Sequence, residues 1–263
     1  MNLSPLLLIA TLLATPQVAS AQSASGLTAP PRGQATAAAA QWDYEDGDTG
    51  PVHRGELDPA FEACSQGSYQ SPIDIRDPVI AVLPALHFEY PSIQPSIVNV
   101  GHTIKISTPK DATLRIGAQI YTLQQIHFHA PSEEAFNGLR ADMVAHFVHK
   151  NALGQLAVVA VLLQAGPDNT AYAPIFSNLP HPDETVSLTD IELPLNALLP
   201  EELSYYRFAG SLTTPPCSEG VEWIVMHQPV NIGSAQIEAF HQRFKSNARP
   251  VQALNGREVQ YSK

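Results

Sequence analysis

The stretch Gln125-Ile126-His127-Phe128-His129 alternates polar and apolar side chains and places two histidines two residues apart. In a β-strand, residues two apart point to the same face of the sheet. The pattern therefore predicts a strand with Gln125, His127 and His129 on one face and with Ile126 and Phe128 on the other. By itself, a histidine pair at this spacing is compatible with a metal site and also with solvated or packed histidines.

A second strand-like run covers residues 143–149 and carries His146, which shares a face with Val144 and Val148. If the two runs pair antiparallel, His146 converges with His127 and His129. Three neutral imidazoles with an open fourth position form a typical catalytic zinc site. We therefore predict a zinc site at these three histidines. His149 points to the opposite face of its strand, where we expect a core histidine.

Further strand signals lie at residues 114–123, 156–163 and 221–226. Residues 156–163 form a continuous apolar run, which is typical of a strand buried on both faces. The clearest helical signal begins at Ser234, a plausible N-cap, and has apolar or aromatic residues at helical spacing: Ile237, Phe240, His241 and Phe244. The pattern predicts an α+β domain dominated by one large sheet.

Four other segments, spread along the chain, complete a pattern. They are Gln70-Ser71-Pro72-Ile73-Asp74-Ile75, Asn99-Val100-Gly101-His102, Ser211-Leu212-Thr213-Thr214-Pro215-Pro216-Cys217 and Asn247-Ala248-Arg249-Pro250-Val251-Gln252. Together with the two histidine strands they resemble, in the same order, the motifs of α-class carbonic anhydrases. The resemblance runs from about Trp42 to the C-terminus. It implies a single domain with a large, mostly antiparallel, twisted central β-sheet and short peripheral helices.

The resemblance also implies an activity, the reversible hydration of carbon dioxide to bicarbonate and a proton by zinc-hydroxide attack. Thr213 matches the family's gatekeeper threonine and Glu133 the carboxylate that accepts its proton. His102 matches the histidine that shuttles protons to buffer. Gln125 and the backbone carbonyl of Asn247 match the groups that hold His127 and His129. Matches to the substrate pocket are Val148, Val158, Leu212, Thr214, Val221 and Trp223. Taken alone, these side chains read as ordinary core, loop or surface residues.

This chain departs from the family around the third ligand. The usual partner of His146 is a glutamate two residues before it, where this chain has Val144. A valine side chain cannot accept a hydrogen bond, so another group or a water must do so, or the bond is missing. Glu134 is a candidate replacement. Two further departures are Arg54, in place of a tryptophan, and Lys105, in place of a polar amide on the pocket wall.

The N-terminus reads as an export signal followed by a leader. Residues 1–21 contain a short apolar run and end in Ala19-Ser20-Ala21, a typical cleavage pattern, although they carry no Lys or Arg. The run is too short to span a bilayer, which needs about 20 residues. Residues 22–41 are rich in small and polar residues and predict a flexible leader. We expect residues 42–263 to form the carbonic-anhydrase domain, in the periplasm or secreted, with no stable membrane anchor after cleavage.

The chain has two cysteines, Cys64 and Cys217. Behind a signal peptide, two distant cysteines are more typical of a disulfide than of free thiols or zinc ligands. The resemblance implies the same pairing.

The formal net charge of −11 and the absence of a basic run argue against a nucleic-acid partner. The expected partner is a small molecule, carbon dioxide or bicarbonate. The sequence is compatible with a monomer and with a homodimer.

Two alternatives remain open at this point. One is a zinc-binding member of the same family that is catalytically weak or inactive. The other is a cupin-type metalloenzyme, because His127, His129 and Glu133 have the spacing of a cupin metal triplet. The cupin alternative lacks a matching second half and leaves the threonine segment unexplained.

Overall fold

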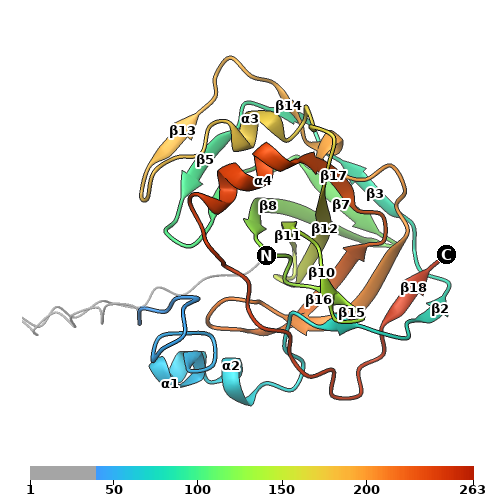
Figure 1. The fold of residues 1–263 in the computed structure, drawn as a ribbon. Helices are drawn as coiled ribbons and strands as arrows, with labels where there is room; N and C mark the ends of the chain where they lie inside the picture. The colour runs from blue at the N-terminus through green and yellow to red at the C-terminus, as the bar shows by residue number, and fades with distance from the viewer. Residues whose placement is uncertain (1–39) are drawn as a thin grey trace, which may run out of the picture. The chain divides into compact units, whose positions relative to one another are not determined.

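Strand β8, Gln119–His129, lies in the middle of a 13-stranded sheet in the computed structural model, which describes residues 40–263 (Figure 1). Along the sheet, the main path is β13 (Thr185–Ser187), β5 (Ser96–Asn99), β6 (Ile104–Ser107), β8, β11 (Met143–Asn151), β12 (Leu156–Gly166), β16 (Glu219–Met226), β15 (Tyr205–Ser211), β18 (Gln260–Ser262) and β2 (Val79–Ala81). Three strands attach beside this path: β3 (Leu86–Glu89), β7 (Thr113–Ile116) and β17 (Val230–Gly233).

Most neighbouring strands in this sheet run antiparallel. The parallel pairings are those of β12 with β16, of β12 with β17 and of β18 with β2. Small sheets join β1 (Asp74–Ile75), β9 (Ala135–Phe136) and β10 (Leu139–Arg140), and β4 (Ser92–Ile93) with β14 (Leu193–Pro194). The predicted mostly antiparallel central sheet is therefore confirmed.

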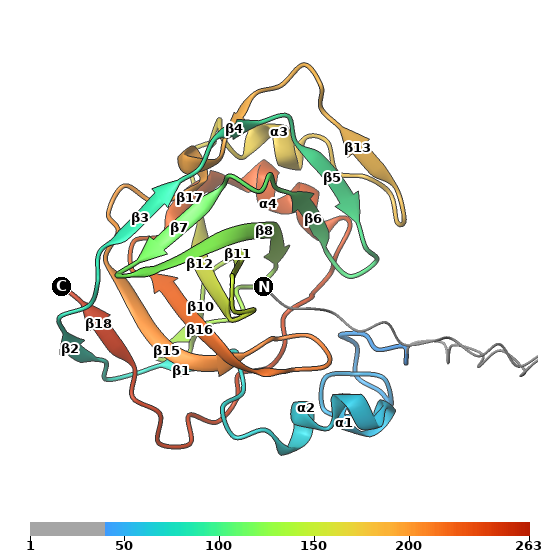
Figure 2. The same cartoon turned by 180° about the vertical axis from the view of Figure 1, so that it is seen from behind.

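The helices are short and peripheral, also as predicted. They are α1 (Arg54–Leu57), α2 (Ala63–Gln66), α3 (Ala173–Phe176) and α4 (Ser234–His241), with 3-10 turns η1 (Pro59–Phe61) and η2 (Leu195–Leu198). Figures 1 and 2 place α3 and α4 together on one side of the sheet near β17, and α1 and α2 at the opposite end. In the described part of the chain, no helix has the length and apolar character needed to cross a membrane.

Strand β12 is covered on both faces. Ala157, Val159, Val161 and Leu163 join one apolar cluster, to which α3 and α4 contribute buried side chains. Val158, Ala160 and Leu162 join a second cluster on the other face, together with Trp223 and Val144. The prediction from the continuous apolar run is confirmed, because both faces of this central strand exclude water.

Two local predictions need correction. The strand predicted over 114–123 is a hairpin: β7 ends at Ile116, Gly117 turns with φ of +57°, and β8 begins at Gln119. Glycine adopts this left-handed conformation without steric cost. The N-cap residue of helix α4 is Gly233, not Ser234. The backbone N–H of Gly233 donates to Gln236 Oε1 at 2.7 Å. The Gln236 side chain thus accepts the N–H of the N-cap residue, and no N-cap side chain accepts an N–H from the first turn.

The disulfide between Cys64 and Cys217 is present, with the two Cα atoms 5.0 Å apart. It joins residues 153 positions apart and fastens α2 to the segment that follows Thr213. The predicted pairing is thus confirmed.

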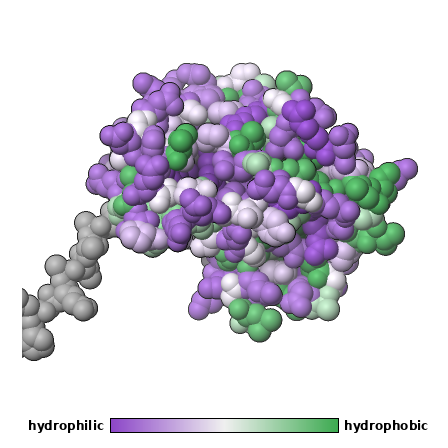
Figure 3. Space-filling view, turned by 90° about the horizontal axis from the view of Figure 1, so that it is seen from below, coloured by the Kyte–Doolittle hydropathy of each residue, from purple (hydrophilic) through white to green (hydrophobic). Residues whose placement is uncertain are grey.

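Polar residues dominate the surface in Figure 3, and apolar side chains gather at the side where β2 and β18 lie. Exposed apolar residues of that region include Val79, Ile80 and Val82. The predicted signal segment, and all of the predicted leader except residues 40 and 41, lie outside the described residues.

Candidate metal centre and active-site cavity

The two histidine strands pair antiparallel, with His146 of β11 directly opposite His127 of β8 and Val144 opposite His129. Ile126 and Phe128 enter the apolar cluster on the far face. The alternation places the ring nitrogens of His127, His129 and His146 together, with one nitrogen from each within 4.8 Å of the others. The ring centroids are 4.8 to 5.2 Å apart. The structure thus brings the three histidines to one point.

Each imidazole has one nitrogen turned away from this point and paired with an acceptor. His127 Nδ1 lies 3.0 Å from Gln125 Oε1, and His129 Nδ1 lies 2.6 Å from the carbonyl oxygen of Asn247. His146 uses its other nitrogen, because Nε2 lies 3.2 Å from Glu134 Oε1. An N–H that donates outward leaves the second ring nitrogen unprotonated and facing inward. The inward atoms are therefore Nε2 of His127, Nε2 of His129 and Nδ1 of His146.

Unpaired buried atoms at this point test whether the residues fit a metal ion. Among the described residues, His129 Nε2 and Glu133 Oε2 are buried without any hydrogen-bond partner. They lie 3.5 Å from each other, and Glu133 Oε2 lies 3.9 Å from His146 Nδ1. Burying such groups unpaired costs free energy. A divalent cation bound by three imidazoles would satisfy His129 Nε2, and this donor set suits zinc with one open position.

Burial and neighbouring charges set the protonation of the three imidazoles. Burial lowers the pKa of His127 well below its ordinary value and also lowers the pKa of His129. For His146, burial also acts to lower the pKa, but Glu134 and Glu133 outweigh it and raise the pKa. Burial acts to raise the pKa of Glu134, whereas His146 lowers it and the net shift is downward. Glu134 is thus held as a carboxylate beside His146.

A cavity of about 190 Å³ opens beside the three histidines. Most of the predicted substrate-site residues line it, namely Val148, Val158, Leu212, Thr214 and Trp223, together with Thr213, Gln125, His102, Thr103 and Lys105. Val221 does not line it. This valine pairs with Leu156 and Gly210 and is buried in the apolar cluster that includes Trp223, two residues further along β16. Because Val221 packs in the same cluster as the cavity residues Val158 and Trp223, its part in the substrate site stays a prediction.

The expected hydrogen bond between Thr213 and Glu133 is not formed in the described structure. Glu133 is fully buried, and its Oε1 accepts the backbone N–H of Arg249 at 2.8 Å. Its Oε2 points toward the imidazole nitrogens described above, and Thr213 lies in the cavity wall. One oxygen of Glu133 is therefore anchored, and the other has no hydrogen-bond partner.

Two buried arginines support the site, and sequence reasoning assigned neither a role. Arg54 donates from Nη1 to the carbonyl oxygen of Thr213 at 2.9 Å, and its guanidinium contacts the rings of both Trp42 and Tyr44. Arg249 donates to Gln70 Oε1 and to the carbonyl oxygens of residues 64 and 71. Arg249 lies in the segment of residues 247–252 that resembles a family motif, so the sequence did mark this residue as a candidate. For Arg54, the only signal was its replacement of an expected tryptophan.

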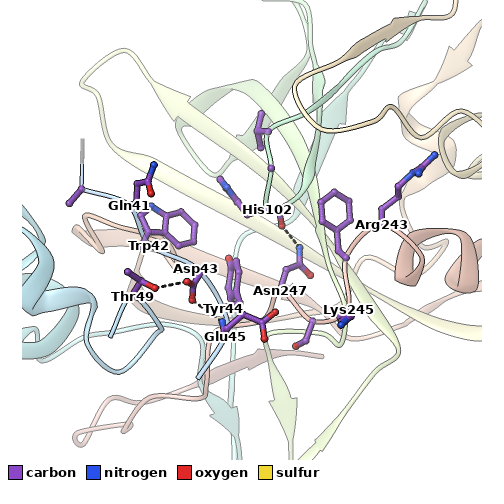
Figure 4. Close-up of a pocket in the computed structure, with 15 residues that line it drawn as sticks. Gln41, Trp42, Asp43, Tyr44, Glu45, Thr49, His102, Arg243, Lys245 and Asn247 are labelled. Atoms are coloured by element: carbon purple, nitrogen blue, oxygen red, sulfur yellow. Dashed lines mark hydrogen bonds between the residues drawn. The ribbon is translucent and has the colours of Figure 1, made fainter. Parts of the chain in front are cut away.

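His102 lines both the inner cavity and a larger groove of about 720 Å³, whose wall is drawn in Figure 4. Its ring packs against Trp42 with centroids 4.6 Å apart, and its carbonyl oxygen accepts the Asn247 side-chain N–H at 2.9 Å. Burial lowers the pKa of His102 to about 4, with help from Lys105, His129 and Arg54. The imidazole is therefore neutral at pH 7, at a position that connects the cavity to the outside.

Comparisons with known proteins agree with this geometry. Residues 55–263 match the family model of the eukaryotic-type carbonic anhydrases. A carbonic anhydrase of Pectobacterium carotovorum is 42% identical over 217 residues, which cover 82% of this chain and 88% of the relative. A carbonic anhydrase of Neisseria gonorrhoeae is 42% identical over 222 residues, or 83% and 86% of the two chains.

Solved structures give the same result. The α-carbonic anhydrase of Thermovibrio ammonificans, in complex with the inhibitor sulfanilamide, superposes with a TM-score of 0.81 at 40% identity. The match covers 85% of this chain and all of that one. Dioscorin complexed with ascorbate superposes with a TM-score of 0.77 at 32% identity, over 84% and 97% of the two chains.

The cupin alternative is wrong, because the histidines stand on the central strands of a large sheet shared with carbonic anhydrases. The family's activity is the zinc-dependent hydration of carbon dioxide, and the chain is an enzyme of this kind. It belongs to the α-class, or eukaryotic-type, carbonic anhydrase family.

Proposed function

We propose that His127 Nε2, His129 Nε2 and His146 Nδ1 hold one zinc ion and that residues 42–263 carry out the reversible hydration of carbon dioxide. One observation carries the proposal: three imidazole nitrogens converge within 4.8 Å while the opposite nitrogen of each ring is paired with an acceptor. When bound, zinc supplies a Lewis acid that lowers the pKa of a coordinated water to about 7. The remaining steps belong to the side chains of the protein.

Gln125 and Asn247 orient two of the ligands. Each accepts an N–H from the Nδ1 atom of an imidazole, which fixes the tautomer and turns Nε2 inward. Asn247 is itself held, because its side chain accepts the Ala130 N–H and donates to the carbonyl oxygens of His102 and Phe128. Partners of this kind raise ligand basicity and fix ring orientation.

Carbon dioxide is small, neutral and apolar, so its site must exclude water beside polar groups. The apolar wall formed by Val148, Val158, Leu212 and Trp223 meets this need within the cavity of about 190 Å³. Thr214 and Lys105 add polar groups to the same lining. We assign the apolar wall to carbon dioxide and the polar side to departing bicarbonate, which carries a negative charge.

The Thr213 hydroxyl orients the reacting group in the cavity. We assign its proton to Glu133 Oε2, the buried carboxylate oxygen without another partner. A hydroxyl that donates in this direction keeps its lone pairs toward the cavity, where they accept a hydrogen bond from the reacting group. Glu133 serves as acceptor because its other oxygen is already fixed by the Arg249 N–H.

Hydration releases one proton for each bicarbonate formed, and His102 is our assigned carrier. Its ring lies on the path from the cavity to the outer groove, and a neutral ring nitrogen can accept a proton there.

We assign the enzyme to the periplasm or the exterior of the cell, since residues 1–21 read as an export signal and the cysteines are paired. Light scattering after size exclusion measures the oligomeric state.

Metal analysis combined with stopped-flow carbon dioxide hydration tests the function. We expect one zinc per chain and hydration far above the buffer background, inhibited by sulfonamides and small anions that take the open position. A protein that holds one zinc per chain but does not hydrate carbon dioxide would overturn the proposal in favour of the inactive alternative.

A further inference from the structure

We propose that Glu134 is the positioning residue of His146 and that it has taken over, from a different part of the chain, the role that Val144 cannot perform. The inference rests on the zinc site proposed above. It concerns how firmly the metal is held and not the reaction itself.

The geometry around His146 Nε2 carries the inference. Glu134 places Oε1 at 3.2 Å and Oε2 at 3.4 Å from this nitrogen, and both side chains are buried. No other acceptor pairs with this nitrogen in the part of the chain that the structure describes. The contact makes Nε2 the donor and leaves Nδ1 facing His127 and His129. Without Glu134, the ring would lose the interaction that selects its tautomer.

Backbone contacts hold Glu134 in place. The Ser132 hydroxyl donates to the Glu134 carbonyl oxygen at 2.7 Å, and the next residue, Ala135, begins β9 and donates its N–H to the Ile73 carbonyl oxygen. Strand β9 pairs with β1 through Asp74 and Ala135. The carboxylate is therefore presented by a segment tied to β1, and not by β11, which carries His146.

Val144 explains why the acceptor comes from elsewhere. It is fully buried on the same face of β11 as His146, in an apolar cluster that also contains Ile73 and Val158. Its side chain contributes packing and no acceptor. A carboxylate at this position would enter a well-packed apolar cluster beside Glu134, which already occupies the partner position.

The two consecutive glutamates serve opposite sides of the His146 ring. Glu133 Oε2 lies on the inward side, 3.9 Å from Nδ1, whereas Glu134 lies on the outward side, against Nε2. A change at Glu134 should therefore alter metal retention while leaving the contact between Glu133 and Arg249 intact.

The rate of zinc release into excess chelator tests this assignment on the zinc-loaded full chain. Loss of an outer partner of a metal-bound histidine costs about 10–100-fold in metal affinity or activity. We expect Glu134→Ala to release zinc about 10–100-fold faster than the unaltered chain. Glu134→Gln, which keeps the shape and one acceptor oxygen, should lie between the two. The matched control Glu222→Gln removes a carboxylate on β16 from its ion pair with Arg207 of β15 and should leave the rate unchanged.

A variant that moves the carboxylate to position 144 distinguishes loss of the His146 partner from general destabilisation of the fold. Glu134→Ala combined with Val144→Glu returns a carboxylate to the face of β11 and should slow zinc release again, whereas Val144→Glu alone should lower the melting temperature without slowing release. Circular dichroism establishes that each variant is folded.

Three outcomes would overturn the inference. The first is a folded Glu134→Ala, or Glu134→Gln if the alanine variant does not fold, that releases zinc within twofold of the unaltered rate. The second is a folded double variant that releases zinc as fast as Glu134→Ala. The third is an unaltered chain that takes up no zinc. That result would also overturn the proposed function, which distinguishes it from the first two outcomes.

Discussion

Arg54 donates a hydrogen bond to the backbone carbonyl oxygen of Thr213, although the two residues are 159 positions apart. The guanidinium is fully buried, and its second hydrogen bond runs to the carbonyl oxygen of Asp43. Burial lowers the pKa of Arg54. The disulfide at Cys217 fastens the same segment four residues later. The threonine that borders the cavity is thus held from two independent directions.

Replacing Arg54 by methionine should destabilise the fold and misplace Thr213. A hydrogen bond from a charged group is worth about 1.5–3 kcal/mol, and the two carbonyl oxygens would lose their donor. We expect a loss of unfolding free energy of about this size in urea titrations, together with a lower kcat for hydration. Arg54→Lys keeps the charge but cannot reach both carbonyls, so it should recover only part of both losses. Unchanged kcat in a folded Arg54→Met would show that Thr213 does not depend on this contact.

His102→Ala should slow turnover mainly when buffer is scarce. The histidine lines both the cavity and the outer groove, and its proposed task is proton export and not attack on carbon. Stopped-flow assays at low and high buffer concentration measure the effect, and added imidazole should restore much of the loss. Equal rates for the variant and the unaltered enzyme at low buffer would exclude His102 as the proton carrier.

Removing the disulfide should lower the free energy of unfolding, while all the residues that line the cavity are retained. The bridge closes a segment of 153 residues, and losing a native disulfide typically costs about 2–5 kcal/mol. We expect the Cys64→Ser and Cys217→Ser double variant to unfold at correspondingly lower denaturant concentration. Intact mass before and after alkylation verifies the pairing in the parent protein. Two alkylated thiols in unreduced parent protein from an oxidising compartment would contradict it.

His149 should make the protein sensitive to mild acid. It lies in the core against the Tyr90 hydroxyl, and burial lowers its pKa to about 4, whereas the ordinary histidine value is about 6.5. Between these values the unfolded chain binds a proton that the folded chain does not, so stability falls as pH falls from 6.5 to 4. The shift corresponds to about 3 kcal/mol.

The variant His149→Gln isolates this contribution, because glutamine does not titrate. It should be less stable than the parent at pH 7, since the Tyr90 contact is altered. That difference should shrink by about 3 kcal/mol at pH 4. Urea titrations at both pH values measure it. A constant difference would show that His149 does not titrate between these limits.

The sequence by itself determined the histidine face, the covered central strand and the cysteine pair. Alternation along residues 125–129 is a local property with a period of two, so it assigns His127 and His129 to one face before any partner is known. The apolar run of β12 likewise reports burial on both faces. The sequence also predicted His146 as the third ligand, because its strand has the same alternation and can pair antiparallel with residues 125–129.

Tertiary structure alone decided the contacts that join segments without a periodic pattern. Glu134 reaches His146 from irregular chain, and Arg54 reaches Thr213 from the first residue of the short helix α1. The hairpin at Gly117 was missed because the apolar pattern continues across the turn. These positions depend on how distant segments pack, and no short stretch of sequence contains that information.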